Sequence, residues 1–315
     1  MIRPLILAGL IAGPAGAQTV DDTTAATGAR AAENAVRSAG DAFGTSIGRE
    51  TIGLYNAGNV RGFSPTQAGN VRIDGLYFDQ LWGLNPRLRR ATTIRVGLSA
   101  LGSPFPAPTG IVDYAFRKPG DDAALSVLGA LNQWGNAALE VDANLPVAKG
   151  LSVAAGGALF DDRFYNATRA SFWQFSLAAR YAPSDDIEIV PFVARSEGFD
   201  ETGPIFLPAG EGLPPRLPRR FFKGPDWARY RGVAFNGGVL GTWRPGPGWE
   251  VRAGIFRSLF DDARGFANLI TDLDQAGNGA QLVIADPPVK FASTSGELRL
   301  TRTITDGPRA HRIHA

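Results

Sequence analysis

Residues 173–181 alternate between two kinds of side chain. The odd positions are apolar or aromatic, and the positions between them include Gln174, Ser176 and Arg180. Because successive side chains of a strand point to opposite faces, this pattern predicts a strand with one apolar face. Similar alternation recurs at residues 139–145, 233–243 and 249–255, and more weakly at 125–131, 151–159, 187–194 and 291–302. The chain is therefore expected to be mainly β, with an antiparallel sheet.

The connections between these segments differ in length in a regular way. Short turns at Pro146–Gly150, Pro183–Asp186, Pro245–Gly248 and Asp306–Pro308 alternate with longer joints at Asp161–Arg169, Ser196–Tyr230 and Asp261–Val289. A transmembrane barrel has tight turns on one side of the membrane and long loops on the other, whereas a soluble sandwich has no reason to sort its loops. The pattern favours an antiparallel transmembrane β-barrel, to which residues 120–315 contribute about eight or nine strands.

The N-terminus predicts export. Residues 1–17 combine a basic start, a short apolar run and a small-residue site at Ala15–Ala17, the pattern of a signal peptide. Residues 18–42 are small, polar and rich in alanine, and we expect a flexible periplasmic lead. The chain has no apolar run of the roughly 20 residues that a membrane-spanning helix needs, so any crossing of a membrane is made by strands.

Composition excludes several functions. The chain has no cysteine, which rules out disulfides and thiolate metal sites. Its two histidines, His311 and His314, leave most metal and general-base chemistry without its commonest residue. The net charge of +2 is too small to indicate nucleic-acid binding. We expect no enzymatic activity, no metal site and no cofactor.

Residues 43–119 contain the most informative motif. Asn59–Pro65 reads NVRGFSP, and Asn70–Asp79 reads NVRIDGLYFD. The residues that define the motif are Arg61, Gly62, Phe63, Arg72, Asp74 and Gly75. This stretch resembles the plug domain of TonB-dependent outer-membrane receptors, and so do Thr93–Val96 and the run from Thr109 to Pro119. The resemblance covers roughly residues 43–315.

The resemblance implies a fold, a location and partners. Residues 43–119 would be the plug, and residues 120–315 an incomplete barrel, about eight or nine strands of the 22 that the family has. We therefore expect the chain to be the N-terminal portion of a receptor in the cell outer membrane. Its implied partners are the TonB energising complex, whose box would lie at Gln18–Asp21, and a scarce ligand, foremost a ferric siderophore.

Physical reasons support these residue types independently of the family. Gly62 and Gly75 permit a positive φ or close backbone approach, and Asp74 beside Gly75 is a tight-turn pair. A plug arginine could bind a wall carboxylate in bidentate fashion, or could instead lie solvated at the surface. The candidate carboxylates on the polar face of the strands are Glu140, Asp142 and Glu250.

The joint at residues 196–230 is a candidate ligand site. It concentrates cations and aromatic rings, among them Arg216, Arg219, Arg220, Phe221, Phe222 and Trp227. Such a set binds anionic, ring-bearing ligands by charge and stacking. The same side chains could instead contact the phosphates of lipopolysaccharide in the outer membrane.

A different class of function remains open. A secreted or periplasmic β-rich binding protein would show a similar alternation around a soluble core. A carboxylate glycosidase would need paired acids, for which Asp161–Asp162 and Asp261–Asp262 are candidates, although solvated acids are also common at a polar rim. A truncated gene product without function is the third possibility.

Overall fold

The computed structural model describes two sheets and a short hairpin. It covers the backbone of residues 38–41, 44–46, 55–56 and 59–60, and then residues 64–96, 100, 103–105, 110–131, 135–210, 216 and 218–315. Within these ranges, no helix has the length and apolar character to cross a membrane. The hairpin is formed by β3 (Tyr55–Asn56) and β4 (Asn59–Val60).

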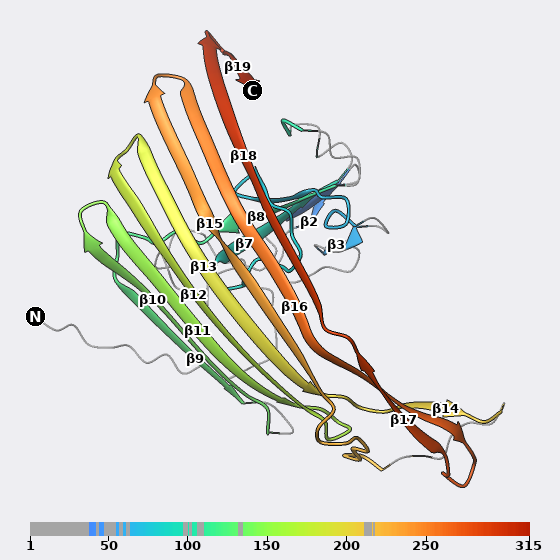
Figure 1. The fold of residues 1–315 in the computed structure, drawn as a ribbon. Coiled ribbons are helices and arrows are strands. Elements are labelled where there is room, and N and C mark those ends of the chain that lie inside the picture. The colour runs from blue at the N-terminus through green and yellow to red at the C-terminus, as the bar shows by residue number, and fades with distance from the viewer. Residues whose placement is uncertain are drawn as a thin grey trace, which may run out of the picture.

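The large sheet is a curved wall of nine long strands in chain order (Figure 1). They are β9 (Ala124–Leu131), β10 (Ala137–Ala148), β11 (Leu151–Arg163), β12 (Arg169–Ser184), β13 (Ile187–Glu201), β15 (Arg229–Gly246), β16 (Trp249–Leu273), β18 (Val289–Asp306) and β19 (Arg309–His314). Each pairs antiparallel with the next, and the sheet does not close on itself. The mainly β class and the incomplete antiparallel barrel are confirmed.

The connections are sorted by length. The four hairpins β10–β11, β12–β13, β15–β16 and β18–β19 turn tightly at one end of the wall, and the longer connections gather at the other end (Figure 1). We call these the turn end and the loop end. Gly150, Gly248 and Gly307 all adopt a positive φ in these turns, which glycine permits without steric cost.

Two of the expected loops contain strands. The joint predicted at 261–289 is wrong in part, because β16 continues to Leu273 and pairs with β17 (Ala280–Asp286). Within 196–230, β13 continues to Glu201 and β14 (Ile205–Pro208) pairs parallel with β16. Backbone hydrogen bonding between these segments, which are far apart in sequence, produces a three-stranded extension beyond the loop end of the wall (Figure 1).

The small sheet belongs to an inner domain on the concave side of the wall (Figure 1). Its order is β2-β1-β7-β8-β5-β6. The strands are β1 (Ser38–Asp41), β2 (Gly44–Ser46), β5 (Val71–Ile73), β6 (Leu76–Tyr77), β7 (Arg89–Arg95) and β8 (Ile111–Phe116). β1 falls within residues 18–42, expected to be a lead, yet its backbone pairs with β7. The small sheet therefore begins before residue 43.

The wall has an unusual distribution of polarity. On β12, Gln174 and Ser176 are buried on one face, whereas Phe175 and Leu177 on the opposite face are 45% and 39% exposed. Rings also pack across the seam, where Phe78 lies edge-on to Phe256 with centroids 5.8 Å apart. The inward face of the wall therefore combines buried polar and apolar residues, whereas its outward face exposes apolar residues.

Candidate functional site

The candidate site is the seam between the inner domain and the wall. At its centre is the turn between β5 and β6, where Asp74 and Gly75 both have a positive φ, of 48° and 79°. The Gly75 amide donates to Asp113 Oδ1 at 2.8 Å, and the Phe116 amide donates to Asp74 Oδ1 at 2.8 Å. The tight turn expected for this pair is thus present, and the neighbouring strand β8 fixes it.

Two wall arginines hold the carbonyl groups of this turn. Arg252 donates to the carbonyl oxygen of Asp74, and Arg299 Nη2 donates to that of Gly75 at 2.8 Å. These carbonyls lie at the tip of a hairpin, where the strand ladder offers them no partner. The wall therefore supplies charge-assisted bonds to the turn.

Arg72 is buried at the seam. Its Nη1 lies 3.3 Å from Glu297 Oε2 of β18, and its guanidinium carbon lies 3.8 Å from the centroid of the Phe105 ring. Desolvation by burial lowers the pKa of Arg72, and the charge of Glu297 opposes this effect. The arginine remains cationic at neutral pH because its pKa in water is far above 7.

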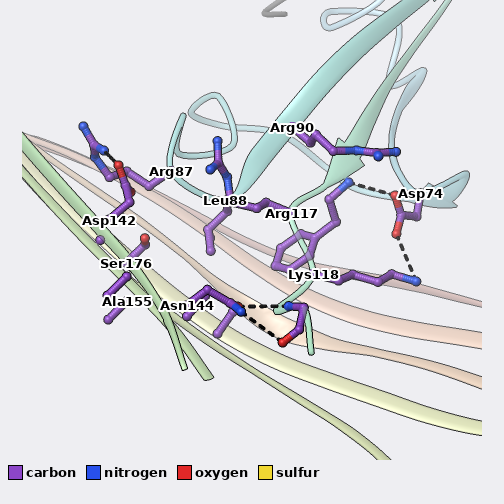
Figure 2. A pocket seen from close by; sticks show the side chains of 16 residues that line it. Asp74, Arg87, Leu88, Arg90, Arg117, Lys118, Asp142, Asn144, Ala155 and Ser176 are labelled. Atoms are coloured by element: carbon purple, nitrogen blue, oxygen red, sulfur yellow. Dashed lines mark hydrogen bonds and ion pairs between the residues drawn. The ribbon is translucent and has the colours of Figure 1, made fainter. Parts of the chain in front are cut away.

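Arg87 makes the contact with the wall that the sequence assigned to a motif arginine. Its fully buried guanidinium donates to Asp142 of β10 (Figure 2) and to Glu140 of the same strand. The expectation that Glu140 and Asp142 bind a plug arginine is confirmed. The expectation for Glu250 is wrong, because this carboxylate lies at the turn end of the wall, 3.4 Å from Arg244.

A stretch of backbone in the inner domain crosses three strands of the wall. The amides of Tyr77, Asp79, Leu81 and Asn85 donate in turn to Glu297, Ser295, Ser258 and Asn236, at 2.9 to 3.1 Å. These acceptors lie on β18, β16 and β15. Sequence reasoning missed this set, although the signal was present as polar residues on the inward face of otherwise apolar strands.

The segment that leaves the inner domain borders a cavity of about 410 Å³ (Figure 2). Lys118 Nζ lies 2.7 Å from Glu188 of the wall and 3.7 Å from Asp74 of the turn. Asn144 accepts from the Gly120 amide at 2.9 Å and donates back to the Gly120 carbonyl at 3.0 Å. The exit toward β9 is therefore tied to the wall at two points.

The loop residues expected to bind ligand lie outside the seam between the inner domain and the wall. The Arg220 amide donates to the Tyr165 carbonyl at 2.8 Å, and Trp227 packs edge-on to Phe266 of the extension at 5.7 Å. Asn268 of the extension donates to the Lys223 carbonyl at 3.1 Å. The structure describes all six candidates, Arg216, Arg219, Arg220, Phe221, Phe222 and Trp227. Of the motif residues, Arg61, Gly62 and Phe63 lie outside the described residues.

An aromatic pair that the sequence did not suggest lies at the apex of the inner domain. Trp82 stacks on Phe260 of β16 with centroids 4.6 Å apart and ring planes 7° apart. Trp82 is 44% exposed and the adjacent Leu81 36% exposed. The amide of Leu81 donates to Ser258, two residues before Phe260 and toward the turn end of β16, so the stack lies on the side of the loop end.

Comparison with solved structures explains this arrangement. The chain resembles the pyoverdine outer-membrane receptor FpvA of Pseudomonas aeruginosa PAO1, with a TM-score of 0.64 and 14% identity, over 90% of this chain and 41% of that one. It also resembles the ferric-catecholate import receptor Fiu of Escherichia coli K12, with a TM-score of 0.62 and 11% identity over 90% and 41%. The ferric preacinetobactin receptor BauA of Acinetobacter baumannii gives 0.59 and 16% over 80% and 39%.

The chain has the fold of a TonB-dependent receptor. The inner domain has the fold of the plug, and the wall that of part of the barrel. The chain spans about two-fifths of the length of these solved receptors. No protein-family model and no curated protein matches it at the level of sequence. The similarity to these receptors is therefore a similarity of fold.

Proposed function

We propose that this chain is the plug and part of the barrel of an outer-membrane receptor that takes up a ferric siderophore with energy from the TonB complex. One observation carries the proposal. The plug packs against the concave face of the wall, through polar bonds and a buried apolar cluster that includes Phe192, Leu240 and Phe256, whereas the convex face is apolar and exposed. A soluble protein would bury that apolar face, because its contact with water is unfavourable.

The height of the apolar face matches a membrane. Outward residues of β16 are mostly apolar from Val251 to Leu259, and the first acidic one is Asp261. At about 3.4 Å per residue and a strand tilt of about 40°, the rise from Val251 to Asp261 is about 26 Å. Outer-membrane barrels carry an apolar band about 25 Å tall. We call this surface the apolar band, and it includes Leu145, Leu177, Ile189, Ile255 and Leu298.

Aromatic residues mark both borders of the band. Tyr181, Trp243 and Trp249 are 47%, 51% and 40% exposed near the turn end. Trp173 and Phe199 occupy the outward face toward the loop end. Amphipathic rings of this kind collect at the two interfaces of a membrane. Their placement supports a crossing with the turn end in the periplasm.

The siderophore part of the proposal is supported by the solved structures. Those proteins are receptors of pyoverdine, of ferric catecholates and of ferric preacinetobactin. Among the described residues of the plug, Leu81 and Trp82 are the exposed large apolar ones, and they lie toward the loop end, where a ligand from outside would arrive. The six cationic and aromatic loop residues, Arg216 to Trp227, remain candidates for its capture at the rim.

Two experiments test the proposed location and the proposed ligand separately. The protein is produced with its own N-terminus in a Gram-negative host, and membranes are separated from soluble periplasm. We expect recovery in the outer membrane and extraction only by detergent. Release with the soluble periplasm would overturn the proposal and favour a soluble β-rich binding protein or glycosidase.

Ligand binding is then measured on the detergent-extracted protein. Ferripyoverdine, a ferric catecholate and ferric preacinetobactin are titrated while tryptophan fluorescence is recorded, with Trp82→Phe as the matched control. We expect one of the three to quench the wild-type protein in a saturable manner and the control less. Absence of quenching by all three in a correctly located protein would overturn the siderophore assignment and leave the receptor fold intact.

A further inference from the structure

The outward face of the wall carries a cationic patch at the upper edge of the apolar band. We call it the rim patch, and it consists of Arg195, Glu197, Arg231, Arg257, Arg264 and Lys290. We propose that the rim patch binds the phosphate groups of a glycolipid in the outer leaflet. This inference rests on the proposed location in the outer membrane.

The direction of these side chains follows from the strand register. Ser258 and Asn236 accept bonds from the plug, so the even positions of β15 and β16 face inward. Arg257 and Arg231 occupy odd positions of the same strands and therefore face outward. A register shift between Asp262 and Arg264 reverses the parity beyond it, and Arg264 pairs with Arg231 and shares its outward face. On β13, Phe192 packs on Phe116 of the plug with centroids 4.8 Å apart, which turns the odd-numbered residues of that strand outward.

The register also sets the height of the patch. Arg195 pairs with Phe235, which pairs with Leu259, near the upper border of the apolar band. Glu197 lies one row further, beside Val233 and Trp173. Arg257 lies one outward position below Leu259, so the patch spans the upper edge of the apolar band. In a membrane, this is the level of the lipid headgroups.

Two of the arginines are held in place by one carboxylate. The side chain of Glu197 is only 8% exposed, and its oxygens lie 3.3 Å from Arg195 Nη2 and 2.6 Å from Arg231 Nη2. Each guanidinium also lies 5.8 Å from an aromatic centroid, Arg195 from Trp173 and Arg231 from Phe199. The two groups are thus ordered before any ligand arrives.

Charge and donors favour phosphate. The five cations of the patch exceed the three outward carboxylates at this level of the wall, Glu197, Asp261 and Asp161. The side chains of Arg195 and Arg231 remain 49% and 38% exposed despite their bonds to Glu197. A guanidinium has five N–H donors, so donors remain for a second, external oxyanion, and its planar fork matches phosphate.

A membrane lipid explains the position better than a soluble anion. A soluble ligand taken up by the receptor passes over the concave face, and the rim patch lies on the opposite side of the sheet. Acyl chains of a lipid whose phosphates reach Arg195 would lie along the apolar band below it, beside Phe175 and Leu177. One lipid would therefore contact both the rim patch and the apolar band, whereas free phosphate would contact only the rim patch.

The test compares two variants of the detergent-extracted protein. Arg195→Gln with Arg231→Gln removes the paired cations, and Arg244→Gln removes an arginine of similar exposure, 51%, at the turn end. Binding of a bisphosphorylated glycolipid in mixed micelles is measured by native mass spectrometry. We expect about tenfold weaker binding by the double variant, because two charge-assisted contacts are lost, and no change by the control. Equal binding by all three proteins would overturn the inference.

Two further arms separate charge from hydrogen-bond geometry and lipid from free phosphate. Arg195→Lys with Arg231→Lys keeps the charge and the outward position, and we expect binding between that of the wild type and that of the glutamine variant. Unchanged mobility of the unheated variants on gels shows that they are folded. Displacement of the glycolipid by millimolar inorganic phosphate would overturn the assignment to a lipid. Recovery of the wild-type protein outside the outer membrane would instead refute the proposed function.

Discussion

The guanidinium of Arg87 on the plug is bonded to the carboxylate of Asp142 on wall strand β10 (Figure 2). The arginine side chain is fully buried, and those of Asp142 and of its second partner, Glu140, are 13% and 16% exposed. A charge buried in this way stays in place only when it is paired. The pairing therefore ties the position of the plug to the second strand of the wall.

Arg87→Met is expected to destabilise the seam by about 3–5 kcal/mol, because it removes the counter-charge of two largely buried carboxylates while keeping an apolar stem. The measurement is the urea midpoint of plug unfolding in detergent, followed by proteolysis of the exposed plug. Arg90→Met changes an exposed arginine of the same strand region and serves as control, with an expected effect below about 0.5 kcal/mol. Equal effects of the two substitutions would contradict the role given to Arg87.

Gly156→Ala is expected to weaken the same pair. A Cβ at Gly156 of β11 would lie 2.3 Å from Asp142 Oδ1 and 3.0 Å from Arg87 Cδ, so the carboxylate must move away from its partner. We expect a loss of about 1–3 kcal/mol in the unfolding measurement. Gly129→Ala is the control, because a Cβ there meets nothing within 4 Å. In the Arg87→Met background the loss should shrink, and an undiminished loss would show that the strain lies elsewhere.

Ile255→Arg is expected to cost about 2–4 kcal/mol in a bilayer, because it places a charge in the middle of the apolar band. Leu282→Arg is the matched control in the three-stranded extension, beyond the band. The two side chains are 55% and 49% exposed, so in a soluble protein both substitutions would be nearly neutral. The measurement is the yield of folded protein in the outer membrane and its unfolding free energy in lipid. Similar outcomes for both variants would count against a membrane-spanning wall.

Asp113 should make plug stability depend on pH. Burial raises the pKa of Asp113 above its ordinary 3.8, the nearby charge of Asp74 adds to this effect, and the bond from the Gly75 amide opposes it. The folded plug therefore binds the proton more tightly than the unfolded chain does. The stability that this group contributes is fully present below about pH 3.8 and is lost as the pH rises through the folded-state pKa.

Asp113→Asn tests this dependence because the amide oxygen can still accept from Gly75 and no longer ionises. Between pH 4 and pH 7, we expect the urea midpoint of the wild-type plug to fall more steeply than that of the variant. Parallel profiles would show that Asp113 does not carry the pH dependence. A variant that is less stable at every pH would show that the carboxylate is needed for the turn at Asp74 and Gly75.

The local sequence pattern was sufficient to predict the strands of the wall. Alternation with period two, as in 173–181, depends only on adjacent residues, and turn residues such as those of 245–248 act within a few positions. The nine strands, the tight turns and the resemblance of Asn70–Asp79 to a plug could therefore be predicted. The distinction between joints and paired strands could not, because β14 and β17 depend on hydrogen bonds to the distant end of β16.

Which side chains share a face of each strand follows from the order of the residues alone, since that is a property of the extended backbone. What each face contacts depends on how the two sheets pack together. The tertiary structure buried Gln174 and left Leu177 exposed on the opposite face, and it joined Glu140 and Asp142 to Arg87. The position of Arg87 had no sequence signal, because its partners lie more than fifty residues away and a buried ion pair arises only when two sheets meet.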